Sequence, residues 1–162
     1  MHVLTEEASR QLDQILTELL ERVEAEAVFL CDRGGNIIAS HAISSYAHQE
    51  NIAALASGSF FATLEMARLI GEDEFKYLLH QGEKNSIYME SAPGDMLLLV
   101  VFSKDSNPGL VKLFVRNASE QLKQFHLDEA LRQSKSPTTG VSLQFEMDEN
   151  AQPFVQQDPD KK

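Results

Sequence analysis

The sequence has few of the residues that mark several large classes of protein. Its 162 residues include one cysteine and no tryptophan, so it cannot form an internal disulfide and has no cysteine pair for a zinc site. Basic residues are also scarce: 14 Lys and Arg stand against 25 Asp and Glu, a net charge of −11. Binding to nucleic acids or to anionic membranes needs a positively charged surface, so we expect neither.

Long apolar runs are absent as well. The longest, Met96–Phe102, has the length of a buried strand rather than the roughly 20 residues that span a bilayer. Residues 1–4 lack a basic stretch followed by an apolar one, so we expect no secretory signal and no direct membrane insertion. The composition predicts a cytoplasmic globular protein, with one domain over residues 1–135 and an acidic tail, disordered in isolation, over residues 136–162.

The spacing of apolar residues predicts three helices and five strands. The first helix begins at about Thr5, with Thr5 as N-cap, and two short strands follow around a glycine-containing turn. A long second helix ends near Gly71. The predicted strands are 27–31, 37–40, 74–81, 86–90 and 96–102, and the later helices are about 47–70 and 110–133. The order αββαβββα, with a mostly antiparallel five-stranded sheet, predicts an α+β sandwich.

The second helix has two unlike faces. We expect its core face to include Ile52, Ala56, Ser59, Thr63, Met66 and Ile70, flanked by Leu55, Phe60 and Ala67. Phe61 would then lie on the outer face, among Ala54, Ser57, Gly58, Leu64, Glu65 and Arg68. Small residues around an aromatic ring favour a surface for a partner, although another layer of the same chain is an alternative.

No catalytic constellation is visible. The five histidines lack metal-ligand spacing, Cys31 lies in an apolar strand, and Gly34-Gly35 lacks the residues of a phosphate-binding loop. We therefore expect no catalytic residue, no metal site and no cofactor, and we interpret the chain as an interaction module.

The tail places apolar residues among acids. One interpretation is a spacer; the other is a short motif that folds onto a partner, with Phe145, Met147 and Phe154 as its anchors.

Four segments resemble the roadblock (dynein light chain) family, and in particular its MglB-like bacterial members. They are Phe29–Ile38 (FLCDRGGNII), Met66–Phe75 (MARLIGEDEF), His80–Met89 (HQGEKNSIYM) and Leu97–Ala118. Together they extend over the whole predicted domain.

The resemblance implies a roadblock-type homodimer, in which the second helices lie side by side and an edge strand continues the sheet. Residues 74–81 would provide this edge, with Tyr77, Leu78 and Leu79 at or near the dimer contact. The paired helices would bind one Ras-like GTPase of the MglA type, two protomers to one GTPase. Ala54, Gly58, Phe61, Glu65 and Arg68 would lie at or beside that contact.

The implied activity is stimulation of GTP hydrolysis, in cell polarity or motility, with location at the poles through partners. MglB-like proteins reposition the switch regions of the GTPase rather than insert an arginine, so Arg33, Arg68 and Arg116 are not expected to be catalytic. Phe61 and Glu65 stand where the group usually has small residues. This departure leaves open a scaffold or adaptor that binds a GTPase without stimulating hydrolysis. A ligand-sensing domain is a third alternative.

Overall fold

The computed structural model describes residues 6–45 and 47–124. Its elements follow the order α1 (Glu6–Arg22), β1 (Ala27–Asp32), β2 (Ile37–Ala42), α2 (Gln49–Leu69), β3 (Tyr77–Gln81), β4 (Asn85–Ala92), β5 (Met96–Ser103) and α3 (Pro108–Gln124). This is the predicted order. The N-cap predicted at Thr5 and the last nine residues of the third predicted helix lie outside the described residues.

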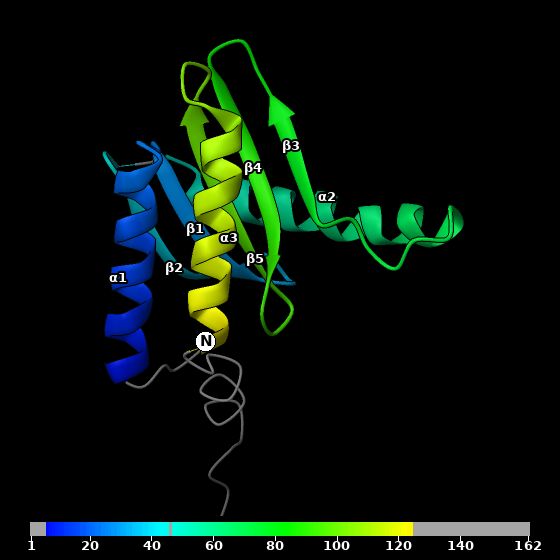
Figure 1. Ribbon diagram of the computed structural model, residues 1–162, viewed down its shortest axis with the longest axis horizontal. Coiled ribbons are helices and arrows are strands. Elements are labelled where there is room, and N and C mark those ends of the chain that lie inside the picture. The colour runs from blue at the N-terminus through cyan, green and yellow to red at the C-terminus, as the bar shows by residue number, and fades with distance from the viewer. Residues whose placement is uncertain (1–5, 46, 125–162) are drawn as a thin grey trace, which may run out of the picture.

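The five strands form one antiparallel sheet in the order β2-β1-β5-β4-β3. β5 is central and is buried along seven of its eight residues, which explains its unbroken apolar sequence. α1 and α3 lie side by side on one face of the sheet, and α2 lies on the other (Figure 1). The predicted α+β sandwich therefore has three layers.

The helix ends follow from local sequence. Asn107 precedes α3, and its Oδ1 accepts a hydrogen bond from the Gly109 N–H at 2.8 Å, as an N-cap does. At the other end of α2, Gly71 adopts φ 82°. The Glu72 N–H then donates to the Ala67 carbonyl at 2.9 Å and the Gly71 N–H to the Arg68 carbonyl at 3.1 Å. This is the Schellman motif, and it confirms the predicted stop at Gly71.

The third strand begins later than predicted. Residues 74–76 belong to the loop that returns from α2, and regular pairing with β4 begins at Tyr77. α2 is longer than the sheet is wide at that point, and its C-terminal half extends past β3 (Figure 1). The loop therefore has to run back along the helix before the strand can start.

α2 is also long and apolar enough, by length and composition alone, to cross a membrane. Its packing offers another explanation, because one side of the helix lies on the sheet and contains the fully buried Ala53 and Phe60. The rest of its apolar surface faces away from the sheet.

Candidate functional site

The outer side of α2 exposes large apolar side chains. Leu55, Met66 and Leu69 are 75%, 54% and 86% exposed. The exposed Gly58 and Ala62 lie between them on the same side of the helix, and nothing lies within 4 Å of the position that a Cβ on Gly58 would occupy. We call these five residues the α2 surface. An apolar helix face with small residues at its centre allows a second backbone to approach closely.

The α2 surface differs from the predicted outer face. Ala56, Phe60, Thr63 and Ala67 are buried as predicted. Leu55, Ser59, Met66 and Ile70, however, are exposed, and Ser57 is buried. At 100° per residue the true core face is rotated by roughly 80° from the predicted one. Periodicity favoured the larger side chains for the core, but apart from Phe60 small ones occupy it.

Packing of the β1–β2 turn against α2 explains why small side chains lie on the core face of this helix. Gly35 adopts φ 81°, and a Cβ added there would lie 2.5 Å from the Ala54 Cα. The Ser57 hydroxyl donates a hydrogen bond of 2.8 Å to the Arg33 carbonyl. Only small residues on α2 permit contact this close, so Ser57 faces inward.

Phe61 lies at the flank of the α2 surface rather than at its centre. It is half-buried and packs against the core on this side of the sheet. Its ring meets that of Phe60 edge-on at 5.5 Å between centroids, and the Arg33 guanidinium carbon lies 4.8 Å from its centroid. The same chain therefore covers one side of the ring, and a partner contact at its other side stays a prediction.

The charged residues predicted on the outer face pair with each other. Arg68 Nη1 and Glu65 Oε1 are 2.5 Å apart, and both side chains are mostly exposed. Such a pair contributes little to stability. Ala54, Gly58, Glu65 and Arg68 are all exposed. Gly58 belongs to the α2 surface, and the other three lie along one side of it.

The edge strand β3 presents three predicted contact residues, on two different faces of the sheet. Tyr77 and Leu79 lie toward α3, and Leu78 packs toward the α2 side. Tyr77 stacks on Tyr88 at 5.3 Å between centroids. Lys112 from α3 places its Nζ 4.3 Å from the Tyr77 ring centroid. These contacts hold the first residue of the edge strand in place.

Two titratable groups, Cys31 and Tyr88, lie in the core, and their surroundings raise their pKa values. Burial, with Asp32 as a smaller cause, raises the pKa of the Cys31 thiol to about 12, so the thiol is protonated and inert at neutral pH. Burial and the hydrogen bond that the Tyr88 hydroxyl donates to Glu90, at 2.7 Å, raise the pKa of Tyr88. Over residues 6–45 and 47–124, no three His, Cys, Asp or Glu side chains are placed to hold a metal ion.

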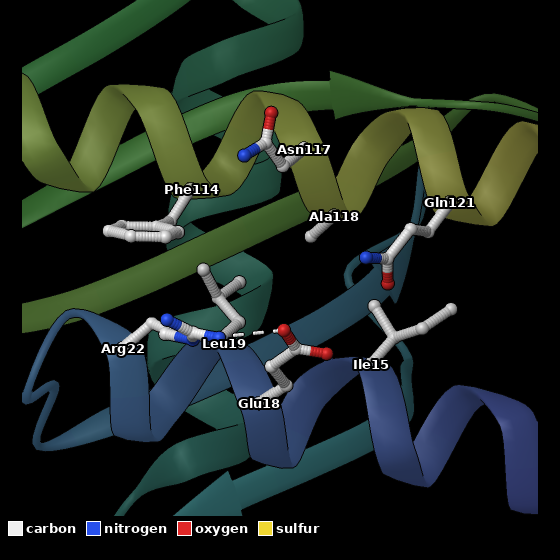
Figure 2. Close-up of a pocket in the computed structure, with 8 residues that line it drawn as sticks. All are labelled: Ile15, Glu18, Leu19, Arg22, Phe114, Asn117, Ala118 and Gln121. Carbon is white, nitrogen blue, oxygen red and sulfur yellow. Dashed lines mark ion pairs between the residues drawn. The ribbon is translucent and has the colours of Figure 1, made fainter.

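An open groove of about 200 Å³ runs between α1 and α3, on the face of the sheet opposite α2 (Figure 2). Ile15 and Phe114 contribute apolar surface to it, and Glu18 and Arg22 lie at its wall as a pair 3.8 Å apart. Asn117 and Gln121 add amide groups from α3. The groove has no nucleophile paired with a base, so it offers no catalytic arrangement.

Comparison with known proteins identifies this architecture. The model of the family described as "Roadblock/LC7 domain" matches residues 11–102. MglB of Myxococcus xanthus is 31% identical, over 71% of this chain and 94% of that one, with a TM-score of 0.67. The gliding protein MglB of Thermus thermophilus is 29% identical, over 82% of this chain and 96% of that one, with a TM-score of 0.71. A structure described as MglB with a tetrameric arrangement is 27% identical over the same shares, with a TM-score of 0.72.

Proposed function

The chain belongs to the Roadblock/LC7 domain family, and from its MglB-like fold we propose that it is a homodimeric activator of a small Ras-like GTPase of the MglA type. The observation that carries the proposal is the α2 surface, which exposes Leu55, Met66 and Leu69 beside β3, an edge strand of the sheet that the described residues form. We further propose a cytoplasmic regulator of cell polarity or motility, because the similar proteins of known structure include a gliding protein.

Two features at the same edge of the sheet support the proposed dimer. β3 is an edge strand, so one row of its backbone N–H and C=O groups is open to pairing. The C-terminal half of α2 extends past that edge (Figure 1). If a second copy pairs its own β3 edge to edge, its sheet lies beneath the extended half of α2. Leu69 and Ile70, which are exposed in one protomer, then come to lie near the second protomer.

The GTPase contact is proposed for the part of the α2 surface around Gly58. There the side chains are small and close contact is possible, and Glu65 and Arg68 neutralise each other. The rest of the chain is strongly acidic, with a net charge of −11. Burial of an apolar surface supplies the binding energy, and the surrounding acids steer the encounter.

Activation in this proposal is conformational. Arg33 is held over Phe61 and Arg68 is paired with Glu65, so neither is presented as a free cation to the transferring phosphoryl group. A homodimer that binds one arrangement of the GTPase switch regions more tightly shifts the population toward it. The GTPase then supplies its own stabilisation of the transition state.

The test is GTP turnover by an MglA-type GTPase with and without the full-length protein. We expect turnover to rise by at least roughly tenfold, the effect of lowering the barrier by about 1.4 kcal/mol. Gly58→Arg should abolish the increase, because it fills the centre of the α2 surface. Leu113→Asp is the matched control: Leu113 is half-exposed on α3, on the opposite side of the sheet, and its substitution should leave turnover stimulated.

Binding without any rise in turnover would instead favour the scaffold or adaptor function. Phe61 and Glu65 motivate that alternative, because they alter the flank of the α2 surface. Loss of stimulation in Leu113→Asp but not in Gly58→Arg would contradict the placement of the GTPase on α2.

A further inference from the structure

The two edges of the sheet differ in what lies beside them. The C-terminal half of α2 extends past β3, whereas β2 ends the sheet on the side of α1 (Figure 1). Within the described residues β2 pairs only with β1. This second edge takes no part in the proposed GTPase contact. The backbone groups on its outer side have no partner strand among the described residues.

One row of β2 backbone groups points away from the sheet. The Ile43 N–H donates to the Glu26 carbonyl at 3.0 Å, so Ile43 faces β1, and by alternation His41 and Ala39 also face it. Ser40 and Ala42 therefore direct their N–H and C=O groups outward. A bulge interrupts the register near Ile37, but the stretch 39–42 remains regular.

This edge has few of the residues that protect exposed strands. Residues 37–43 (IIASHAI) include no Pro, Lys, Arg, Asp or Glu, although these are the residues that usually prevent pairing with a further strand. Ile43 is 73% exposed immediately after the strand. An edge that lacks Lys, Arg, Asp, Glu and Pro, with Ser40 and His41 as its polar residues, is a template for one more strand.

The chain itself contains a segment suited to that position. Val141, Leu143, Phe145 and Met147 alternate with Ser142, Gln144 and Glu146, which is the strict alternation of a half-buried strand. The seven residues are one more than the six of β2. Glu146 is the only charged residue in the segment, so pairing brings no like charges together.

The segment is also within reach of the edge. The last turn of α3 and the first turn of α1 lie at the same end of the molecule (Figure 1), and α1 is tied to β2 by Asp13 and His41 at 2.7 Å. Residues 125–140 separate α3 from the segment, and a chain of that length spans up to about 50 Å. We propose that residues 141–147 add to β2 as a sixth strand of the same protomer.

Amide hydrogen exchange in the full-length protein, followed residue by residue by NMR, tests this directly. Ser40 and Ala42 should exchange at least roughly tenfold more slowly than in a Leu143→Asp/Phe145→Asp variant, since only the added strand protects them. His41 and Ile43 point into the sheet, so their protection should be the same in both proteins. Phe154→Asp is the matched control, because it changes a tail aromatic outside the segment.

Three results would overturn the proposal. In the first, Ser40 and Ala42 exchange as fast in the full-length protein as in the double variant. In the second, the protection is lost on dilution, which would assign the edge to a second copy of the chain. In the third, Phe154→Asp releases the two amides as fully as the double variant. None of these readouts depends on a GTPase, so the result is independent of the function proposed above.

Discussion

The two faces of the sheet are covered in different ways. On one face α1 and α3 lie side by side, and their apolar stripes bury Leu16 and Val115 completely. On the other face α2 lies alone, contacts the sheet through small residues and Phe60, and leaves Leu55, Met66 and Leu69 exposed. On the first face, α1 and α3 leave only Leu110 and Leu113 half-exposed among their large apolar side chains in the described residues. The second retains apolar surface that the fold of one protomer does not use, and this is the physical reason to place a partner there.

The largest effect expected on the α2 side comes from the one large, fully buried side chain that α2 itself contributes. Phe60 is 1% exposed, so Phe60→Ala should lower the free energy of unfolding by about 3–5 kcal/mol, through lost burial and the cavity left behind. Phe61→Ala, at the half-buried neighbour, should cost only about 1–2 kcal/mol. Urea denaturation of both variants measures the difference. Equal losses would show that Phe61 belongs to the core and not to the flank of the α2 surface.

The close contact between the β1–β2 turn and α2 predicts a smaller loss of stability when it is disturbed. Gly35→Ala should lower the free energy of unfolding by about 2–3 kcal/mol, since the new Cβ meets the Ala54 Cα at 2.5 Å and φ is 81°. Gly58→Ala is the matched control on the same helix. Nothing lies near its Cβ position, so better helix propensity should stabilise that variant by about 0.5–1 kcal/mol. A neutral Gly35→Ala would mean that the turn is not held against the helix.

The smallest expected effect is a loss of stability at alkaline pH, which one titratable group on each side of the sheet would cause. Cys31 packs on the α2 side and Tyr88 on the side of α1 and α3, and burial raises the pKa of both. A raised pKa in the folded state means full stability below the unfolded pKa values, about 9 and 10, and a decline above them. Stability should therefore fall above about pH 9, by roughly 2 kcal/mol at pH 10.

Single substitutions separate the two contributions. Cys31→Ala should remove the part of the decline that begins near pH 9, and Tyr88→Phe the part that begins near pH 10. Thermal unfolding followed between pH 7 and pH 11 gives both curves. A decline that neither substitution changes would assign the alkaline sensitivity to other groups.

Most of the fold could be predicted from local sequence. The alternation and length of apolar runs placed every strand, Gly71 ended α2, and the unbroken run Met96–Phe102 identified the central strand. The misplaced start of β3 has a tertiary cause, because residues 74–76 are used to return from the end of α2. The third helix is confirmed as far as Gln124. The anchors predicted at Phe145, Met147 and Phe154 lie outside the described residues and remain predictions.

The candidate site could be predicted as an element but not as a set of residues. The sequence indicated that α2 carries an unusual outer face of small and apolar residues, and the structure confirms this for Gly58. It did not indicate that Ser57 turns inward to the Arg33 carbonyl or that Met66 turns outward. Periodicity ranks side chains by size, whereas a helix packed closely on a neighbouring turn selects small ones.

The scarcity of basic residues and the single cysteine determined by themselves which kinds of partner and site are disfavoured, because charge and thiol chemistry do not depend on the fold. Local patterns of hydrophobicity likewise predicted the order of the elements. Only the tertiary structure decided which side of α2 is open, because that depends on the distance between Gly35 and Ala54, 19 residues apart in the sequence. The side of α2 against which the rest of the chain packs closely is buried, and the opposite side is therefore the one that can face a partner.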